Sequence, residues 1–263
     1  MTSTLAHHEQ RAQLARDWAE IQERMLVPLY EAVYERVEVG PDTRLLGLGC
    51  GTGLALLLAA GRGAAVTGTE TDGTRLELAR ARLLPEPQRG SRRWSVDLVG
   101  GGPADVPRER TFNLVTAFGR RPDPKSLAAA VARTEPGTPV VLADWGPAER
   151  CAATGALRVA SRLAEPQRSG TTWRPSGRDD LEELAHGAGL RLDGSGRVSC
   201  PFGYADLDNA VRGLLSTGLF AGAVRATDEM QVGKELGEAL QPYLRPDGSV
   251  WMPNLFRYVI ARG

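Results

Sequence analysis

Apolar residues recur at three- and four-residue steps near the start of the chain, which is the spacing of an amphipathic helix. The repeating positions within 9–39 are Leu14, Trp18, Ile21, Met25, Leu29, Ala32, Val33 and Val37. Pro28 interrupts this run. Because proline lacks an N–H donor and clashes with the preceding turn, the pattern predicts two helices or one kinked helix.

Between 40 and 146, short apolar runs alternate with helical patterns. Strands are predicted over 44–48, 65–70, 94–99, 112–118 and 140–145, and helices over 54–61, 74–84 and 126–133. Strands that alternate with helices favour a parallel sheet with right-handed crossovers and helices on both faces.

After Trp145 the pattern becomes richer in helices, over 148–163, 177–187 and 207–244, with two further strands at 196–202 and 256–261. The expected fold class is α/β, a Rossmann-like doubly wound, mostly parallel sheet of about seven strands. N-terminal helices and a helical insertion are expected to cover its cleft. We expect one domain over 1–263, with N-terminal helices in 9–39, a ligand-binding core in 40–146, and a helical cap plus the last two strands in 147–263.

Charge and cysteine content narrow the range of partners. Lys+Arg and Asp+Glu both number 32, so the chain lacks the basic excess that nucleic-acid binding needs. Cys50, Cys151 and Cys200 form no C-x-x-C pair, which argues against zinc and disulfides. The polar start, without a signal-peptide pattern, and the lack of a long apolar run predict a cytoplasmic protein that binds a small molecule and no membrane.

A glycine-rich segment joins the predicted strand at 44–48 to the helix that follows it. It reads Gly47-Leu48-Gly49-Cys50-Gly51-Thr52-Gly53. Glycine permits positive φ and has no Cβ, so a ligand can lie against bare main chain. Glu70 ends the next strand, where a carboxylate can accept hydrogen bonds from both ribose hydroxyls. Together these features predict a nucleotide-type ligand pocket.

The glycine spacing argues against a dinucleotide. That fingerprint requires G-x-G followed three residues later by Gly or Ala, but Thr52 and Leu54 occupy the two positions where that residue would stand. A pyrophosphate clamp is therefore not expected.

At this point the sequence resembles a known family. Residues 45–53, LLGLGCGTG, resemble the first motif of class I S-adenosylmethionine-dependent methyltransferases, usually written (V/L)LDLGCGTG. Residues 66–70 and 112–115 are similar to the family's second and fourth strands, and 133–137 to its RxxxPGG turn. The resemblance is closest to the ubiquinone-biosynthesis-like small-molecule branch. It implies methyl transfer from S-adenosylmethionine to a small molecule, such as an aromatic or polyketide-like natural product.

The same resemblance implies site residues. Those implied for the cofactor are Gly47, Gly49, Cys50, Gly51, Glu70, Thr71, Gly102, Pro103 and Ala117. Those implied for the substrate are Trp18, Tyr30, Phe118 and Trp145, although Trp18 and Tyr30 also fit an apolar helix stripe that belongs only to the core. Within the first set, the glycines would approach the methionine part of the cofactor and Glu70 would hold its ribose. No metal is implied, and no catalytic residue is assigned.

The first motif is degenerate, and two further positions near the expected pocket also depart from the family. Gly47 stands where an acidic residue normally orients the methionine end, and the position of another, which usually meets the adenine amino group, falls within the glycines at 100–102. Asn113 replaces an aspartate at the fourth strand. Losing a charge-assisted hydrogen bond costs about 1.5 to 3 kcal/mol, so two such losses predict affinity weakened about a hundredfold or more, or lost.

Few side chains are candidates for proton transfer. His7 and His8 are expected on a loose N-terminus, and His186 at a helix end, where a capping role is favoured. Asp144, at the end of the fifth strand, could cap a helix, pair with an arginine or act as a base, with a structural use favoured. Arg257, with Asn254 nearby, is expected to fix the helical insertion.

Two other functions stay open on the sequence. Gly47 and the glycines at 100–102 motivate a cyclase or isomerase that inherited the fold and no longer transfers methyl groups. A non-catalytic binding module is the third hypothesis. The substrate, the acceptor atom and the oligomeric state are not predicted.

Overall fold

The structure is a computed structural model that describes residues 2–85, 94–118, 121–164, 176–177 and 179–263. The chain forms two compact units, each assembled from three segments. Unit 1 is Met1–Leu26, Trp145–Gly177 and Ser199–Leu255, and unit 2 is Val27–Asp144, Arg178–Val198 and Phe256–Gly263. The single domain expected over 1–263 stays a prediction.

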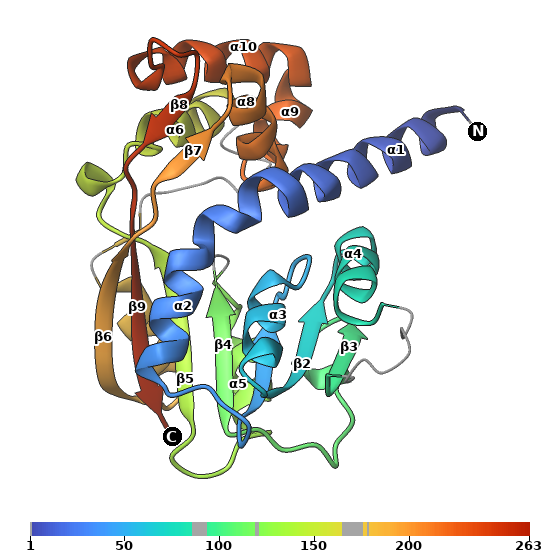
Figure 1. Cartoon of the computed structure of the whole chain (residues 1–263), viewed down its shortest axis with the longest axis vertical. Coiled ribbons are helices and arrows are strands. Elements are labelled where there is room, and N and C mark those ends of the chain that lie inside the picture. Colours follow the sequence, from blue (N-terminus) through green and yellow to red (C-terminus); the bar gives the residue numbers. More distant parts are fainter. Residues whose placement is uncertain (1, 86–93, 119–120, 165–175, 178) are drawn as a thin grey trace. The chain divides into compact units, whose positions relative to one another are not determined.

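Unit 2 holds most of a seven-stranded sheet with the order β3-β2-β1-β4-β5-β9-β6. The strands are β1 Arg44–Leu48, β2 Ala65–Glu70, β3 Val96–Gly100, β4 Leu114–Phe118, β5 Pro139–Trp145, β6 Arg191–Ser199 and β9 Leu255–Arg262. The first five pair in parallel, and Figure 1 shows β9 pointing opposite to β4. The expected seven-stranded, mostly parallel, Rossmann-like sheet is therefore confirmed.

Helices cover both faces of this sheet. They are α2 Val27–Arg36, α3 Leu54–Gly61, α4 Gly73–Leu83, α5 Pro124–Val131 and α7 Asp180–Gly187. Helices α2 and α3 lie in front of the sheet in Figure 1, and the Tyr34 hydroxyl donates to the Ala55 carbonyl to join them (2.9 Å). Helices α5 and α7 bury Leu127 and Leu181 in one apolar core with strand residues that include Val115 and Leu142. Removing these side chains from water drives the layers together.

Unit 1 is mostly helical. Its elements are α1 Thr2–Asp17, a π-helical turn Trp18–Gln22, 3-10 turns Glu23–Leu26, Ala148–Arg150 and Gln241–Tyr243, α6 Thr154–Leu163, α8 Leu207–Ser216, α9 Ala221–Ala226, α10 Glu229–Leu240, β7 Phe202–Tyr204 and β8 Val250–Met252. Buried Asp17 pairs with Arg212 of α8, and the Tyr204 hydroxyl donates to Gln22 Oε1 (2.8 Å). These side chains join the first segment of the chain to the third.

The N-terminal helices differ in detail from the expectation. Helix α1 begins at Thr2 and includes His7 and His8, and the loose N-terminus expected there stays a prediction. The predicted interruption is confirmed, but it is the π-helical turn at Trp18–Gln22 and lies upstream of Pro28. Pro28 is instead the second residue of α2, where a missing N–H costs nothing because the first turn has no partner for it. Across the described residues, no helix is both long and apolar enough to cross a bilayer.

The strand predicted at 196–202 is wrong in its bounds. Strand β6 ends at Ser199, and β7 begins at Phe202 and pairs in the antiparallel direction with β8, which the pattern missed. In the second half of β6, partly buried residues alternate with exposed ones, and no residue of the strand is fully buried. The strand therefore has no continuous apolar run. Pro201 cannot donate to a strand ladder, which explains why pairing stops between the two strands.

Candidate functional site

The residues implied for the ligand gather at one edge of the sheet in unit 2. The carboxyl ends of β1 to β4 meet there, since Leu48 is in register with both Thr69 and Ala117, and Glu70 with Gly100. All nine predicted cofactor positions lie in or just after these strand ends: Gly47, Gly49, Cys50, Gly51, Glu70, Thr71, Gly102, Pro103 and Ala117. Ligands of open parallel sheets bind at this edge.

The glycine turn leaves main chain bare at its tip. Gly49, Gly51 and Gly53 have φ angles of 61°, 59° and 83°, a left-handed conformation that only glycine adopts readily. The Cys50 N–H donates to the Thr69 carbonyl at 2.9 Å, which fastens the turn to β2. A Cβ built on Gly49 would meet no atom within 4 Å. The turn therefore borders open space at Gly49, whereas the side chains of Leu83 and Ala79 pack against Gly53 at its end.

Glu70 is the carboxylate of this turn. Its side chain is buried, with the residue 8% exposed, and it accepts hydrogen bonds from Gly51 N–H at Oε2 and from Asp72 N–H at Oε1, both at 2.9 Å. The hydroxyl of Thr71 lies 3.5 Å from Oε1. A carboxylate offers about four acceptor positions, so the two amides and the long contact with Thr71 leave room for at least one more donor. A ribose hydroxyl suits that position.

The loop after β3 carries a carboxylate that the sequence analysis missed. Gly102 N–H donates to Asp105 Oδ2 at 2.8 Å, and Gly101 N–H donates to the Glu70 carbonyl at 2.9 Å. Pro103 is buried, and a Cβ on Gly102 would meet no atom within 4 Å. An aspartate three residues after a helix-capping position is the signal that could have identified Asp105.

The four residues predicted for the substrate fall into two groups, one in each unit. In unit 2 the Tyr30 and Phe118 rings lie 4.9 Å apart, and Tyr34, which was not predicted, lies 5.8 Å from Phe118. In unit 1 the Trp145 ring lies 5.5 Å from Phe202, and Trp18 begins the π-helical turn. Phe118 ends β4, so the first group adjoins the edge that carries the glycine turn.

Tyr34 does not serve as a base. Its side chain is fully buried, and this burial raises the pKa of the phenol well above its ordinary value. The hydroxyl therefore stays neutral and donates to the Ala55 carbonyl.

Asp144 is held by an arginine, as one of its predicted roles required. Arg121 Nε lies 2.8 Å from Asp144 Oδ2, and Arg121 Nη1 lies 2.6 Å from Asp180 Oδ2 on α7. Asp144 is 5% exposed, so the guanidinium offsets a buried negative charge. The pair supports a structural use of Asp144.

Two predictions about other polar residues are wrong. Arg257 lies inside β9 and pairs with Glu182 of α7 instead of fixing the helical insertion. Asn113 precedes β4, at the amino-terminal edge of the sheet and away from the glycine turn. Its Oδ1 accepts from Arg44 N–H at 2.6 Å and its Nδ2 donates to the Asp42 carbonyl at 2.9 Å. Asn113 therefore joins the starts of two strands and cannot reach a ligand at the opposite edge.

Of the remaining polar candidates, Asn254 makes a buried hydrogen bond within unit 1, and His8 and His186 are exposed to solvent. Asn254 is buried in unit 1, where its Oδ1 accepts from Ala153 N–H at 2.9 Å. His186 is exposed in the last turn of α7, as expected for a helix end, and its carbonyl accepts from Gly189 N–H. His8 is exposed on α1, and the side chain of His7 lies outside the described residues. Within the described part of the chain, no three His, Cys, Asp or Glu residues group to hold a metal ion.

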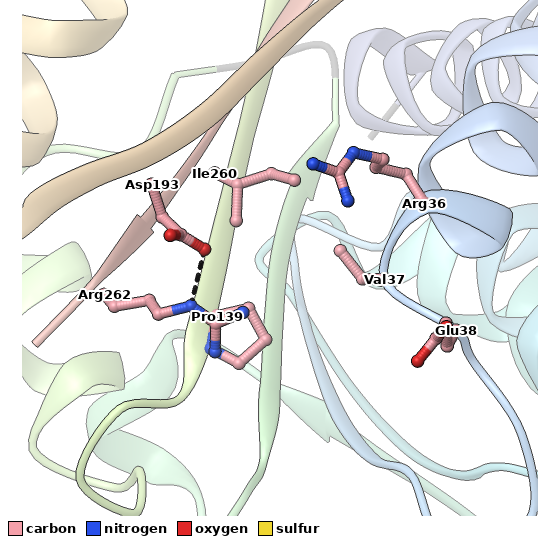
Figure 2. Close-up of a pocket in the computed structure, with 7 residues that line it drawn as sticks. All are labelled: Arg36, Val37, Glu38, Pro139, Asp193, Ile260 and Arg262. Carbon is pink, nitrogen blue, oxygen red and sulfur yellow. Dashed lines mark hydrogen bonds and ion pairs between the residues drawn. The ribbon is translucent and has the colours of Figure 1, made fainter.

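A separate cavity lies at the amino-terminal edge of the same sheet, with a volume of about 230 Å³. Figure 2 shows Arg36 on one side of it and the ion pair between Asp193 and Arg262 on the other. Its lining residues are Arg36, Val37, Glu38, Pro139, Asp193, Ile260 and Arg262. None of the predicted ligand residues lines it, and we assign it no part in the candidate site.

The sheet order and the glycine turn together define the fold of class I S-adenosylmethionine-dependent methyltransferases. Three solved structures with this architecture illustrate the likeness. A Bacillus halodurans protein provisionally assigned as a methyltransferase is similar with a TM-score of 0.57 and 15% identity, covering 89% of this chain and 97% of its own. A S-adenosylmethionine-dependent methyltransferase from Thiobacillus denitrificans, bound to S-adenosylhomocysteine, has a TM-score of 0.51 and 16% identity, covering 89% and 90%.

The third structure is the [4+2]-cyclase SpnF, with a TM-score of 0.53, 16% identity and coverage of 89% and 80%. At these identities the likeness establishes the fold alone. No protein-family model matches the sequence, and no curated protein matches it either.

Proposed function

We propose that the chain transfers a methyl group from S-adenosylmethionine to a small molecule, with an aromatic or polyketide-like acceptor as the expected class. The observation that carries the proposal is the open glycine turn with Glu70 beside it. The family resemblance of residues 45–53 and the methyltransferase neighbours, one of them bound to S-adenosylhomocysteine, support it.

The residues present fit the nucleoside part of this cofactor. Glu70 would accept from the ribose hydroxyls, Gly49 and Gly51 would let the ligand approach main chain, and Gly102 with Pro103 would border the adenine. When bound, the sulfonium of S-adenosylmethionine supplies an electrophilic methyl group. The chain's own contribution is to orient both reactants and to exclude water, which are the main needs of a displacement reaction.

The acceptor is expected to arrive already nucleophilic, as a phenolate or a stabilised carbanion. Asp144 is paired with Arg121, and Tyr34 is a neutral hydrogen-bond donor, so neither serves as a general base. The half-buried Phe118 beside the site, packed against the buried ring of Tyr30, offers aromatic surface for a planar acceptor.

The test is calorimetric binding of S-adenosylmethionine and S-adenosylhomocysteine to the whole chain. We expect both to bind, and Glu70→Gln to weaken binding by about tenfold or more, because a charge-assisted hydrogen bond contributes about 1.5 to 3 kcal/mol. Glu135→Gln is the matched control, since Glu135 is half exposed and pairs with Arg44 near the start of β1. No heat with either ligand at millimolar concentration would refute the proposal.

A second candidate is a cyclase or isomerase that uses the same site without methyl transfer. Glycine at residue 47 and at residues 100–102 favours it, and the fold likeness to a [4+2]-cyclase shows that such chemistry exists on this architecture. Turnover of a substrate that is unchanged after S-adenosylmethionine has been removed would favour this candidate. A methylated product that forms only with the cofactor, detected by mass spectrometry, would exclude it.

A further inference from the structure

Gly47 and Gly68 lie side by side on neighbouring strands. They are register partners in the parallel pairing of β1 with β2. Neither has a positive φ angle, so the backbone itself does not demand glycine at either position. A different constraint must keep both positions without side chains.

That constraint is one leucine of helix α3. Leu56 is 1% exposed. Its Cδ2 lies 2.9 Å from the position of a Cβ on Gly47, and its Cδ1 lies 2.5 Å from a Cβ on Gly68. Real Cβ contacts are longer than this, so a single side chain occupies the space that residues 47 and 68 would otherwise use.

The packing around Leu56 removes charge from one end of the candidate site. Cys50 Sγ also lies 2.8 Å from a Cβ on Gly68, so the wall beside the first glycines is apolar. Glu70, at the end of β2, is the carboxylate bonded to this turn, and it faces the amides of Gly51 and Asp72. The two carboxylates described at this edge, Glu70 and Asp105, therefore lie where the nucleoside would bind, away from the apolar wall beside Gly47.

We propose that Leu56 is a specificity-determining residue of this site. By keeping residue 47 free of a side chain, it makes the site recognise its ligand through the nucleoside and not through the amino-acid group. This inference rests on the proposed function. It predicts that a 5′-thioadenosine without an amino-acid tail binds almost as well as one that carries it.

The first test compares two thioethers that differ only in that tail. Calorimetry on the whole chain should give affinities for S-adenosylhomocysteine and 5′-methylthioadenosine within about threefold of each other. Binding of S-adenosylhomocysteine that is about thirtyfold tighter or more would overturn the inference and leave the proposed function intact. Binding of neither nucleoside would refute the proposed function, and the inference with it.

The second test places a carboxylate at residue 47, either with Leu56 present or with Leu56 replaced by the smaller alanine. Gly47→Asp alone should lower the thermal stability and leave the ratio of the two affinities unchanged, because Leu56 blocks the new side chain. Gly47→Asp combined with Leu56→Ala should raise the preference for S-adenosylhomocysteine about tenfold. Leu56→Ala alone and Gly47→Asp with Leu58→Ala are the matched controls, and both should keep the original ratio.

If the ratio of the affinities for S-adenosylhomocysteine and 5′-methylthioadenosine is the same in Gly47→Asp and in its combination with Leu56→Ala, then Leu56 does not determine specificity. If the combined variant does not fold, the comparison of the two thioethers on the unchanged chain still decides the matter.

Discussion

The two units satisfy their buried polar groups in different ways. At the glycine turn of unit 2, Glu70 accepts from main-chain N–H groups of Gly51 and Asp72, within the strand, turn and helix segment that forms the site. In unit 1, Asp17 and Gln22 are bonded to side chains 195 and 182 residues away. Local turn geometry thus builds the candidate site, whereas unit 1 is assembled from segments that meet only after the chain has folded.

The largest expected effect tests whether the units are also separate in stability. Leu127 in unit 2 and Leu236 in unit 1 are both fully buried. Replacing either by alanine should lower the free energy of unfolding by about 2 to 5 kcal/mol, since it leaves a cavity. Hydrogen exchange should show the loss of protection within the unit that carries the change. An equal loss in both units would mean that they unfold as one cooperative body.

A smaller effect distinguishes the ion pairs of two buried aspartates, Asp144 in unit 2 and Asp17 in unit 1. Arg121→Ala should cost about 3 kcal/mol, because Asp144 and Asp180 both lose the guanidinium in a buried setting. Arg212→Ala should cost about 1 kcal/mol, because the Arg212 side chain is 49% exposed. Asp17 also keeps its hydrogen bond from Gln13.

Urea unfolding measures both costs. A double-mutant cycle of Arg121→Ala with Asp144→Ala should give a coupling of about 1 kcal/mol or more. Equal costs for the two arginines would remove this difference between the units.

The smallest effect concerns one buried tyrosine in each unit. Burial raises the pKa of Tyr34 and of Tyr204 above the ordinary value. Below about pH 10 the phenols are neutral in both folded and unfolded chains, so their contribution to stability is fully present. Above that pH the unfolded phenols ionise first, and stability falls as the pH rises.

Tyr34→Phe and Tyr204→Phe should each lower stability at neutral pH by about 1 kcal/mol, through the lost hydrogen bond. Each should also make the alkaline decline shallower, as measured by denaturant unfolding at several pH values. If stability declined at alkaline pH with the same slope in both variants as in the unchanged chain, neither phenol would be kept neutral by burial.

The sequence predicted the central strands and the glycine turn well. The expected strands at 44–48 and 65–70 are β1 and β2 as the structure has them, because each is a short segment with few charges between turn residues. Glu70 was placed correctly at the end of β2 for the same reason.

The failures involve residues whose roles depend on distant partners. Arg257 was assigned to the insertion because the sequence cannot show that Glu182 of α7 faces it. Asn113 was placed near the ligand by motif similarity, although a residue that precedes a parallel strand belongs to the opposite edge. The role of Leu56 was invisible, because two glycines and a leucine in sequence do not reveal that one fills the space beside the others.

The interlock of Leu56 with Gly47 and Gly68 also limits how this chain can change by single substitutions. Adding a side chain at either glycine, with the leucine in place, meets a steric barrier, and shrinking the leucine first opens a void in the core. Each order of events passes through a less stable intermediate. A carboxylate at residue 47 of β1 therefore requires a second change in the core, at Leu56, before it fits without loss of stability.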